Sequence, residues 1–450
     1  MSLPAYPAYR ESGVPWLGRV PAHWNLTRLR FIAHFNPSKS EIGSLPPETE
    51  VSFLPMDAIG DDGSLRLDAT RPLSAVEQGY TYFRDGDLLI AKITPCFENG
   101  KGALAAGLLG GIGFGTTELI VVRPLPGRAV ASYLNWLFMG PDFRNAGTAA
   151  MYGAGGQKRV PDEFVRNFVV AVPPPAEQRA IAAFLDRECG KIGALVAEQE
   201  RLIALLKEKR QAVISHAVTK GLDPSAPMKD SGVPWLGRVP AHWRSVRVKD
   251  CFQIVNGATP PSDTPEYWDG DIVWVTPADL SNIQGWDITK SQRTISPNGL
   301  FACAATIVQP GSIVISTRAP IGSIGIAAVP LCTNQGCRAL VPCAGTETRF
   351  FAYALTAFTL ELNLYGRGTT FSELSADALG AFPICVPPPA EQRAIAAFLD
   401  RECGKIDTLI SESERAIALL KERRAALISA AVTGKIDVRG LVPAEAARAA

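Results

Sequence analysis

The chain has 450 residues, a length that suggests two or three domains of ~150 residues each. Its 47% hydrophobic and 20% charged residues are typical of a folded globular protein and exclude a largely disordered chain. The net charge of +1, from 45 basic and 44 acidic residues, gives no electrostatic indication of nucleic acid or of an acidic partner.

Targeting signals are not evident. The first residues, MSLPAYPAYRESGVPWLG, lack a basic region followed by an apolar one, which argues against a secretory signal peptide. No window approaches the ~18–20 uninterrupted apolar residues of a membrane-spanning helix. The nine cysteines are scattered along the chain and favour reduced thiols. We therefore expect a cytoplasmic protein.

Two sequence blocks occur twice. They are SGVPWLGRVPAHW, at Ser12–Trp24 and Ser231–Trp243, and VPPPAEQRAIAAFLDRECGKI, at Val172–Ile192 and Val386–Ile406. The offsets are 219 and 214 residues. Similarity continues at the second offset from Leu205–Asp223 to Leu419–Asp437. The order box, insert, helical block is therefore repeated, and such internal repeats take precedence in predicting the architecture.

The inserts between these blocks differ from each other. Asn25–Ala171 and Arg244–Cys385 align weakly, with GDLLIAKITP at Gly86–Pro95 echoing GSIVISTRAP at Gly311–Pro320. Because identical blocks surround different inserts, we infer that the blocks bind the same kind of partner twice and that the inserts bind two different targets. The alternative is a duplication without functional meaning.

Each insert is expected to be a compact α+β domain of ~125–145 residues, large enough for its own core. Short runs such as DLLIAKI, ELIVVRPL and DIVWVTP are β-branched and bounded by Gly, Pro, Asn or Asp, as strands are. Helical stretches are predicted at Ala129–Phe138 and Phe350–Leu362.

A long amphipathic helix is predicted after the prolines at 173–175, ending at Lys220-Gly221, with a break or bend at Gly190 and Gly193. From Ile192 to Thr219 it would measure ~42 Å at ~1.5 Å per residue. The second copy ends near Gly434.

An apolar stripe on a single long helix needs a partner, and the other copy is the obvious one. The two helices would then form a coiled-coil spacer. The residues expected to pack in it are Leu195, Leu202, Leu206, Val213, Leu409, Leu420 and Leu427. The alternative is that each helix packs only on its own domain. The predicted divisions are 1–171 and 224–385 for box plus insert, 172–223 and 386–437 for the helical regions, and 438–450 for an Ala-rich tail.

Catalytic motifs are weak or missing. There is no GxxxxGK[ST] phosphate loop, which argues against ATP hydrolysis. Asn36-Pro37-Ser38-Lys39 only distantly resembles the tetrad with which amino-methyltransferases hold a flipped base. Asp87 with Ile90-Ala91-Lys92 lacks the second carboxylate of a nuclease site. We predict no catalytic residues in this chain.

Metal binding and histidine catalysis are not expected either. Cys332, Cys337 and Cys343 lack a CxxC pair and a nearby histidine, so we interpret them as small hydrophobic residues of strands and predict no metal site. His23 and His242 repeat with the PAHW box. This favours packing or hydrogen bonding to an adjacent element over catalysis.

Polar loops of the inserts are the candidate DNA contacts. Arg and Lys suit guanine or phosphate, Asn and Gln suit adenine, and Thr suits either. The candidates are Lys92, Thr94, Asn99, Lys101, Thr116, Gln157 and Lys158 in the first insert, and Thr317, Arg318, Asn334, Gln335, Arg367 and Thr369 in the second. Any solvated loop can have this composition, so the prediction depends on the organisation of the whole chain.

That organisation resembles the specificity subunit of type I restriction-modification systems. The resemblance is carried by the SGVPWLGRVPAHW boxes, the PPPAEQRAIAAFLD segments, the LLKEKRQAVISHAVTKGLD and LLKERRAALISAAVTGKID helices, and GDLLIAKITPCFENGKGALA in the first insert. It extends from about residue 11 to residue 437.

The resemblance implies a fold and a set of partners. The inserts would be two target-recognition domains, each reading half of a bipartite double-stranded DNA sequence. Two antiparallel helices would hold them apart with pseudo-twofold symmetry, and each repeated region would dock a modification subunit. This chain would be non-catalytic and carry no cofactor. S-adenosylmethionine would bind to the modification subunits and ATP to a further restriction subunit.

The charge of the inserts bears on affinity. Residues 25–150 contain 11 basic and 13 acidic residues, and residues 244–370 contain nine of each. Because counterion release normally drives DNA affinity, the chain alone is expected to bind DNA weakly and to rely on its partners for phosphate contacts. The alternatives are a scaffold whose inserts bind two proteins or peptides, and a self-sufficient enzyme.

Overall fold

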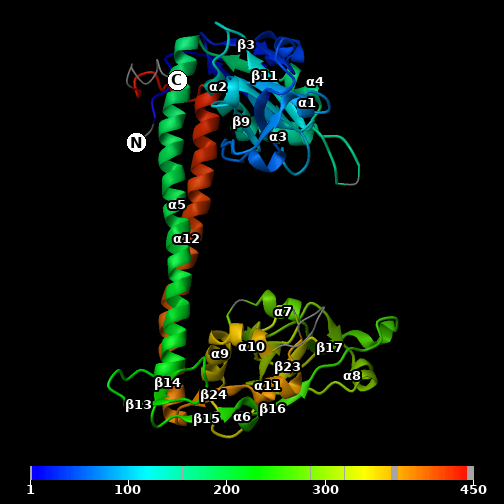
Figure 1. The fold of residues 1–450 in the computed structure, drawn as a ribbon, viewed down its shortest axis with the longest axis vertical. Coiled ribbons are helices and arrows are strands. Elements are labelled where there is room, and N and C mark those ends of the chain that lie inside the picture. The colour runs from blue at the N-terminus through cyan, green and yellow to red at the C-terminus, as the bar shows by residue number, and fades with distance from the viewer. Residues whose placement is uncertain (1–2, 155, 284, 319, 366–372, 443–450) are drawn as a thin grey trace. The chain divides into compact units, whose positions relative to one another are not determined.

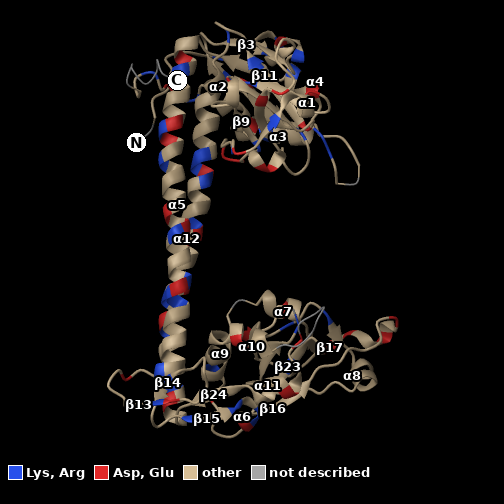
Figure 2. Ribbon diagram, viewed as in Figure 1, with Lys and Arg blue, Asp and Glu red and all other residues tan. Residues whose placement is uncertain are grey.

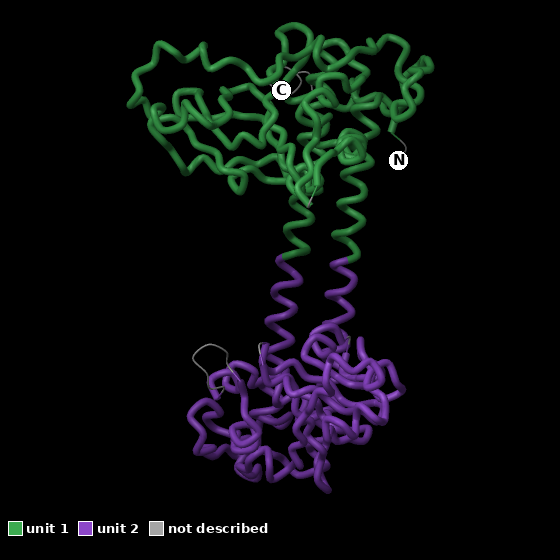
Figure 3. The backbone as a smooth tube through the Cα atoms, turned by 90° about the vertical axis from the view of Figure 1, so that its right-hand side faces the viewer, with its two compact units in different colours: residues 1–200, 415–450 green, residues 201–414 purple. Residues whose placement is uncertain are grey.

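The structure is a computed structural model that describes residues 3–154, 156–283, 285–318, 320–365 and 373–442. It divides into two compact units, of which unit 1 is built from two stretches of the chain and unit 2 from one. Unit 1 comprises residues 1–200 and 415–450, and unit 2 comprises residues 201–414 (Figure 3).

Unit 1 contains two four-stranded sheets beneath short helices (Figure 1). One has the order β4-β11-β8-β9 and is antiparallel; the other has the order β6-β5-β10-β7, with β5 and β10 parallel. The elements are β1 (Tyr9–Glu11), β2 (Arg19–Pro21), β3 (Asn25–Arg28), β4 (Ala33–Phe35), β5 (Glu50–Leu54), β6 (Thr70–Pro72), α1 (Leu73–Val76), β7 (Thr81–Arg84), β8 (Leu88–Ala91), β9 (Gly102–Leu104), β10 (Ile112–Gly115), β11 (Leu119–Pro124), α2 (Ala131–Met139), α3 (Pro141–Ala149), α4 (Asp162–Asn167) and β12 (Val169–Val172).

Unit 2 has the same pairing order in its first sheet. The sheet β16-β23-β20-β21 is antiparallel and gains β18 at its edge, and the second sheet is β19-β17-β22. The elements are β13 (Met228–Asp230), β14 (Arg238–Pro240), β15 (Arg244–Arg247), α6 (Val248–Cys251), β16 (Phe252–Asn256), β17 (Trp268–Val275), α7 (Pro277–Ser281), β18 (Asp287–Ile288), β19 (Thr294–Ile295), α8 (Pro297–Cys303), β20 (Ile313–Ser316), β21 (Ile324–Ala327), β22 (Leu331–Thr333), β23 (Cys337–Pro342), α9 (Thr348–Ala357), α10 (Thr359–Tyr365), α11 (Ala376–Ala381) and β24 (Pro383–Val386).

The weak sequence similarity between the inserts corresponds to equivalent strands in the two units. GDLLIAKITP contains β8 and GSIVISTRAP contains β20, and both strands lie inside their sheets with every residue buried. Such all-apolar runs are expected where both faces of a strand are covered. The mixed α+β class predicted for each insert agrees with these elements.

The two predicted helical stretches in the inserts are present, but the second is divided. Ala129–Phe138 corresponds to α2, whereas Phe350–Leu362 contains most of α9 and the start of α10. Phe358 separates them with φ −103° and ψ 23°, outside the α-helical values.

The two long helices are uninterrupted, so the predicted break at Gly190 and Gly193 is wrong. The helices are α5 (Pro175–Lys220) and α12 (Pro389–Val432). Both glycines are exposed, and a Cβ built on either would meet nothing within 4 Å. Each costs helix propensity of about 1 kcal/mol, which the packing of neighbouring turns offsets.

Buried or half-buried residues follow a strict heptad spacing along both helices. In α5 they are Leu185, Cys189, Ile192, Val196, Gln199, Ile203, Leu206, Arg210, Val213 and Ala217. In α12 they are the residues 214 positions later, Leu399, Cys403, Ile406, Ile410, Ser413, Ile417, Leu420, Arg424, Leu427 and Ala431. We call these two sets the heptad stripe.

Three of the leucines predicted to pack in the spacer lie outside the heptad stripe. Leu206, Val213, Leu420 and Leu427 belong to it, but Leu195, Leu202 and Leu409 are exposed by 52%, 42% and 47%. The prediction followed the large apolar residues. The stripe instead uses the following residues Val196 and Ile203, together with polar members such as Gln199 that an apolar pattern does not reveal.

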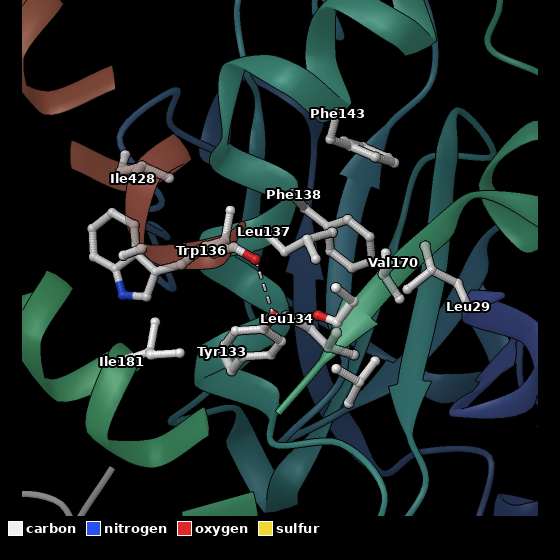
Figure 4. Packing of buried hydrophobic residues seen from close by; sticks show 14 of the residues in the cluster. Leu29, Tyr133, Leu134, Trp136, Leu137, Phe138, Phe143, Val170, Ile181 and Ile428 are labelled. Carbon is white, nitrogen blue, oxygen red and sulfur yellow. Dashed lines mark hydrogen bonds between the residues drawn. The ribbon is translucent and has the colours of Figure 1, made fainter. Parts of the chain in front are cut away.

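The core of each unit is completed by the helix of the other repeat. Ile428 of α12 belongs to the same cluster of unit 1 as Ile181 of α5 and Trp136 of α2 (Figure 4). In unit 2, Ile214 and Val218 of α5 belong to the core cluster that also contains residues of α9 and α12. The alternative in which each helix packs only on its own domain is therefore wrong.

A pair of polar residues at the start of each long helix joins the box to the insert. Glu177 accepts hydrogen bonds from the Trp24 indole at 2.9 Å and the Tyr6 hydroxyl at 2.6 Å, and its other oxygen lies 2.8 Å from His23 Nε2. The next residue, Gln178, accepts from the backbone N–H of Val130, the N-cap of α2, at 2.7 Å.

The second copy repeats this arrangement. Glu391 pairs with His242 Nε2 at 2.7 Å and accepts from the Trp243 indole at 3.1 Å. Gln392 accepts from the backbone N–H of Glu347, the N-cap of α9, at 2.9 Å. The interpretation of His23 and His242 as packing and hydrogen-bonding residues is confirmed.

The glycine stops of the long helices are confirmed and have a packing reason. Gly221 and Gly434 have φ of +74° and +73°, the left-handed conformation that favours glycine. A Cβ on Gly434 would lie 2.4 Å from Pro21 Cδ, so the first box closes over the end of α12. The described part of the tail follows, and Val438 is fully buried in the core of unit 1.

Among the described residues, no helix combines the length and apolar character needed to cross a membrane.

The shared core predicts that a residue of the last helical region stabilises the first insert. Ile428→Ala removes a side chain that is 3% exposed and should lower the free energy of unfolding by about 2–5 kcal/mol, measured by chemical denaturation of the full chain. Leu419→Ala, nine residues away and 56% exposed, should change it by less than about 0.5 kcal/mol. Equal effects of the two substitutions would contradict the packing.

Candidate nucleic-acid interface

Three loops of unit 1 meet where strand β8 ends. The backbone N–H of Lys92 donates to the carbonyl of Glu118 at 2.9 Å, and that of Val160 donates to the carbonyl of Lys92 at 2.8 Å. The backbone N–H of Thr94 donates to the carbonyl of Lys158 at 2.9 Å. Residues from 92–101, 116–118, 152–154 and 156–160 are therefore held together, and we call them the unit 1 loop cluster.

An ion pair ties two of these loops. Arg159 donates to both carboxylate oxygens of Glu118, at 2.7 Å from Nη2 and 2.9 Å from Nε. These hydrogen bonds are the main reason why the pKa of Glu118 lies below its usual range. Glu118 thus stays ionised at neutral pH, and Arg159 has its charge compensated within the protein.

The loop after β8 is anchored from beneath by a buried arginine. Arg144 of α3 is 7% exposed and donates to the carbonyls of Phe97 at 3.2 Å, Gly100 at 3.0 Å and Lys101 at 3.4 Å, and to that of Phe138 at 2.7 Å. Burial lowers its pKa to about 10, so it remains protonated at neutral pH. The guanidinium also lies 4.9 Å from the centre of the Phe97 ring.

All seven sequence-predicted contacts of the first insert lie in the unit 1 loop cluster. Asn99, Gln157 and Lys158 are exposed, and Lys92, Thr94 and Thr116 are half-buried. Lys101 belongs to the same loop, but its ammonium donates to the carbonyl of Met56 at 2.9 Å and so holds the loop in place. Whether any of these residues contacts DNA stays a prediction.

Unit 2 brings the equivalent loops together after β20. The backbone N–H of Thr317 donates to the carbonyl of Gly336 at 2.8 Å, and that of Leu374 donates to the carbonyl of Thr317 at 2.9 Å. Arg318 Nη2 lies 3.3 Å from a carboxylate oxygen of Glu373. We call these segments, 317–318, 334–338 and 373–374, the unit 2 loop cluster.

The predicted contact residues of the second insert differ in their exposure to solvent. Arg318 and Gln335 are exposed and Asn334 is half-buried, so their side chains reach the surface of the cluster. Thr317 does not fit the prediction, because it is fully buried and its hydroxyl donates to the carbonyl of Gly336 at 3.2 Å. Arg367 and Thr369 lie outside the described residues.

The remaining motifs have structural roles. The Asn36 side chain accepts from the backbone N–H of Val121 and donates to Asp162, both at 2.9 Å, and its φ of +51° forms the turn after β4. Cys332 and Cys337 are buried in strands, and burial raises their pKa values to about 12. Cys343 is exposed and follows the end of β23, so the strand interpretation is wrong for this residue. Among the described residues, no group of three or more His, Cys, Asp or Glu could hold a metal ion.

Charges of both signs are interspersed over each unit (Figure 2). Several arginines are neutralised internally, as Arg159 is by Glu118. Arg123 donates to Asp87 at 2.6 and 2.7 Å and to Glu41 at 2.7 Å. The near-zero charge of the inserts is therefore accompanied by ion pairs that fix their structure.

Two residues, one beneath the unit 1 loop cluster and one within it, were missed by the sequence-based prediction. Arg144 lies in a helical segment, and no local pattern indicates that it is buried against carbonyl groups. Tyr152 is 64% exposed and begins the loop that contains Gln157 and Lys158. A signal for it exists, since Tyr-Gly occurs at 152–153 and again at 365–366 in the other insert.

Comparisons with known proteins agree on one kind of protein. A family model described as Type I restriction modification DNA specificity domain matches residues 240–415. The chain is 24% identical to the EcoEI specificity subunit of Escherichia coli over 88% of this chain and 81% of that protein. It is 34% identical to the MjaIX specificity subunit of Methanocaldococcus jannaschii over 42% of this chain and 43% of that protein.

Solved structures share the fold over nearly the whole chain. One, from a study of complex assembly and conformational transition of the type I R-M system, has a TM-score of 0.74 at 22% identity, covering 92% of this chain and 98% of the other. The HsdS subunit of Thermoanaerobacter tengcongensis has a TM-score of 0.55 at 22% identity, covering 93% and 98%. At these identities the likeness concerns the fold alone.

The anchoring of the first loop predicts a local effect of removing Arg144. Arg144→Met leaves buried carbonyl groups without donors and should lower the free energy of unfolding by about 2–4 kcal/mol. Hydrogen exchange at the backbone amides of residues 99–101 should become faster, because these amides belong to the loop that the guanidinium holds.

Arg66→Met is the matched control. The Arg66 side chain is 60% exposed and pairs with Asp57 at the surface, so its loss should change the free energy of unfolding by less than about 0.5 kcal/mol. Unchanged exchange at residues 99–101 in Arg144→Met would show that the arginine does not hold this loop.

Proposed function

Because the chain belongs to the family of type I restriction-modification DNA specificity subunits, we propose that it reads a bipartite double-stranded DNA target, one half-site with each unit. The chain is a specificity subunit and not a catalytic one. The loop clusters would face the DNA, and modification subunits docked on the repeated regions would carry out the chemistry.

The observation that carries this proposal is the occurrence of one loop arrangement in two different sequences. In each unit, a buried central strand ends in a polar loop that is hydrogen-bonded to the segment before the last short helix of the insert. The backbone pairing is shared, while side chains at equivalent positions differ, such as Ile93 in one loop and Arg318 in the other. Two domains that recognise different half-sites require a shared backbone with different side chains, because the side chains that contact base edges determine which DNA sequence is bound.

We further propose that α5 and α12 pair as an antiparallel coiled coil that sets the distance between the half-sites, with pseudo-twofold symmetry. Support comes from the uninterrupted course of both helices and from the heptad stripe. In unit 2, Arg210 Nε lies 2.9 Å from Asp407 Oδ1 of the other helix. A rigid helical spacer would determine half-site separation as dimer geometry does in repressors.

Exposed leucines offer two equivalent docking positions for modification subunits. Unit 1 exposes Leu195 and Leu419, and unit 2 exposes Leu409 and Leu205, which are related by the 214-residue offset. Large apolar side chains at equivalent exposed positions are a feature of protein interaction sites. Two copies of one partner fit two equivalent positions.

The cofactors would bind to the partner subunits that carry out the chemistry. S-adenosylmethionine would bind to the modification subunits and ATP to restriction subunits, and this chain would hold neither. Arg159 in unit 1 and Arg318 in unit 2 are each paired with a carboxylate of their own loop cluster, which supports a division in which the partners supply most phosphate contacts. The site of action would be the cytoplasm, where the DNA of the host is found.

Exchange of the inserts tests the assignment of half-sites. Residues 25–171 and 244–385 are exchanged within their frames, and the chimera is expressed with its modification partner. Mapping of methylated adenines in the DNA of the host should show the two half-sites exchanged in order, with assembly retained, because the boxes and the helix starts that flank the inserts are identical. Unchanged methylation sites would contradict the proposal.

Two controls separate the alternatives. If the assembled complex retains no sequence-selective DNA from a randomised library, the chain is a scaffold for other proteins. If the purified chain transfers a methyl group from labelled S-adenosylmethionine to DNA without partners, it is an enzyme in its own right. The purified chain should bind a specific duplex only weakly at physiological salt.

The docking positions predict separable losses of partner binding. Leu419→Glu in unit 1 and Leu205→Glu in unit 2 should each weaken the binding of one modification subunit at least about tenfold, so that each complex contains one such subunit instead of two. The stoichiometry is measured by analytical ultracentrifugation. Leu109→Glu, at a site 47% exposed on the first insert, is the control that should assemble normally.

A further inference from the structure

Tyr152 is the most exposed large hydrophobic side chain among the described residues of unit 1, at 64%. Aromatic rings usually contribute to cores, because burying one stabilises the fold by about 1.5–3 kcal/mol. A ring left in water within the unit 1 loop cluster therefore needs an explanation that the fold does not supply.

The backbone around Tyr152 is fixed. Its N–H donates to the carbonyl of Arg159 at 3.1 Å, and the N–H of Arg159 donates back to the carbonyl of Tyr152 at 2.8 Å. Arg159 also forms an isolated antiparallel β-bridge with Ile93, so its backbone lies between those of Tyr152 and Ile93. Gly153 follows with φ +137°, and a Cβ there would lie 2.5 Å from the carbonyl oxygen of Gln157. The ring thus projects from an ordered position that only glycine at 153 allows.

The neighbours of the ring are polar and partly basic. Residues that face each other across a bridge project to the same side, so Tyr152 and Arg159 lie side by side. Arg159 is in turn paired with Glu118, and Lys158 and Gln157 are exposed one and two residues further along the loop. An aromatic ring beside cationic and amide side chains combines an apolar surface that can contact a thymine methyl group with donors and acceptors for base edges and phosphates.

The corresponding tyrosine of the other unit packs its ring against another aromatic side chain of the same unit. Tyr365 is 37% exposed, and its ring packs edge-on against Phe382 with centroids 5.2 Å apart. Phe168 is the residue equivalent to Phe382, and its ring contacts in unit 1 are with Trp16, Phe143 and Phe164. The free ring is therefore a property of the first insert and not of the shared frame.

We propose that the ring of Tyr152 contacts a nucleobase of the half-site read by unit 1, as a specificity-determining residue. This inference rests on the proposed function. The contact is made by the ring and not by the hydroxyl, because the bases of a duplex are stacked on one another and present only their edges in the groove, where an aromatic ring can contact an apolar group such as the thymine methyl.

The test uses the complete complex with its modification subunits and duplexes that carry the mapped target. Tyr152→Ala should weaken binding about tenfold to a hundredfold, whereas Tyr152→Phe should stay within about twofold of the unsubstituted chain. Phe31→Ala, an aromatic residue of unit 1 that is 49% exposed outside the loop cluster, should also stay within about twofold.

Duplexes altered in one half-site complete the experiment. The effect of Tyr152→Ala should disappear when the half-site of unit 1 is replaced and should persist when the other is replaced. Equal loss in Tyr152→Phe and Tyr152→Ala would overturn the ring contact, and equal loss on every duplex would overturn the base contact. No effect on a complex that still selects its target refutes only this inference, whereas an unsubstituted complex without selectivity refutes the proposed function.

Discussion

Two adjacent polar side chains at the start of each long helix hold the architecture together. Glu177 accepts from the tryptophan of the box while Gln178 accepts from the N-cap of α2, and both are nearly fully buried. A buried carboxylate or amide is stable only when its partners are in place, so these contacts allow one arrangement of box, insert and helix. Glu391 and Gln392 impose the same arrangement on the second repeat. The start of each long helix is therefore fixed within one unit. The end of the same helix completes the core of the other unit, which also contains the start of the second long helix.

The division between identical and different sequence follows from this constraint. The identical blocks supply the box, the Glu-Gln pair and the first three residues of the heptad stripe in each helix, where a change on one helix would require a matching change on its neighbours. The inserts need only preserve a sheet order and the hydrogen bonds that close their loop clusters. Backbone groups supply most of those bonds, as between Thr94 and Lys158, and backbone bonds leave side chains free to vary. Recognition can therefore diverge while the frame remains constant.

The sequence predicted the parts of this structure that have local or periodic causes. The repeats, the long helices with their glycine stops, the mixed α+β class and the bonding role of His23 follow from such patterns. The failures are of another kind. Gly190 looked like a helix break because propensity was weighed without the packing around it. Leu195 looked buried because the true stripe includes polar residues such as Gln199. Thr317 looked like a contact because its burial depends on the distant Gly336, and Arg144 was overlooked for the same reason.

The near-neutral charge also has a structural meaning. An arginine that is free to bind phosphate attracts any DNA, whereas one that is bonded to a carboxylate adds little to nonspecific affinity. Arg159 and Arg123 are bonded in this way, and Arg144 is buried against carbonyl groups. These arginines order the surfaces from which neutral side chains such as Gln157 and Asn99 project. A subunit built in this manner contributes discrimination more than attraction, because hydrogen bonds and apolar contacts at base edges depend on sequence and Coulomb attraction to phosphate does not.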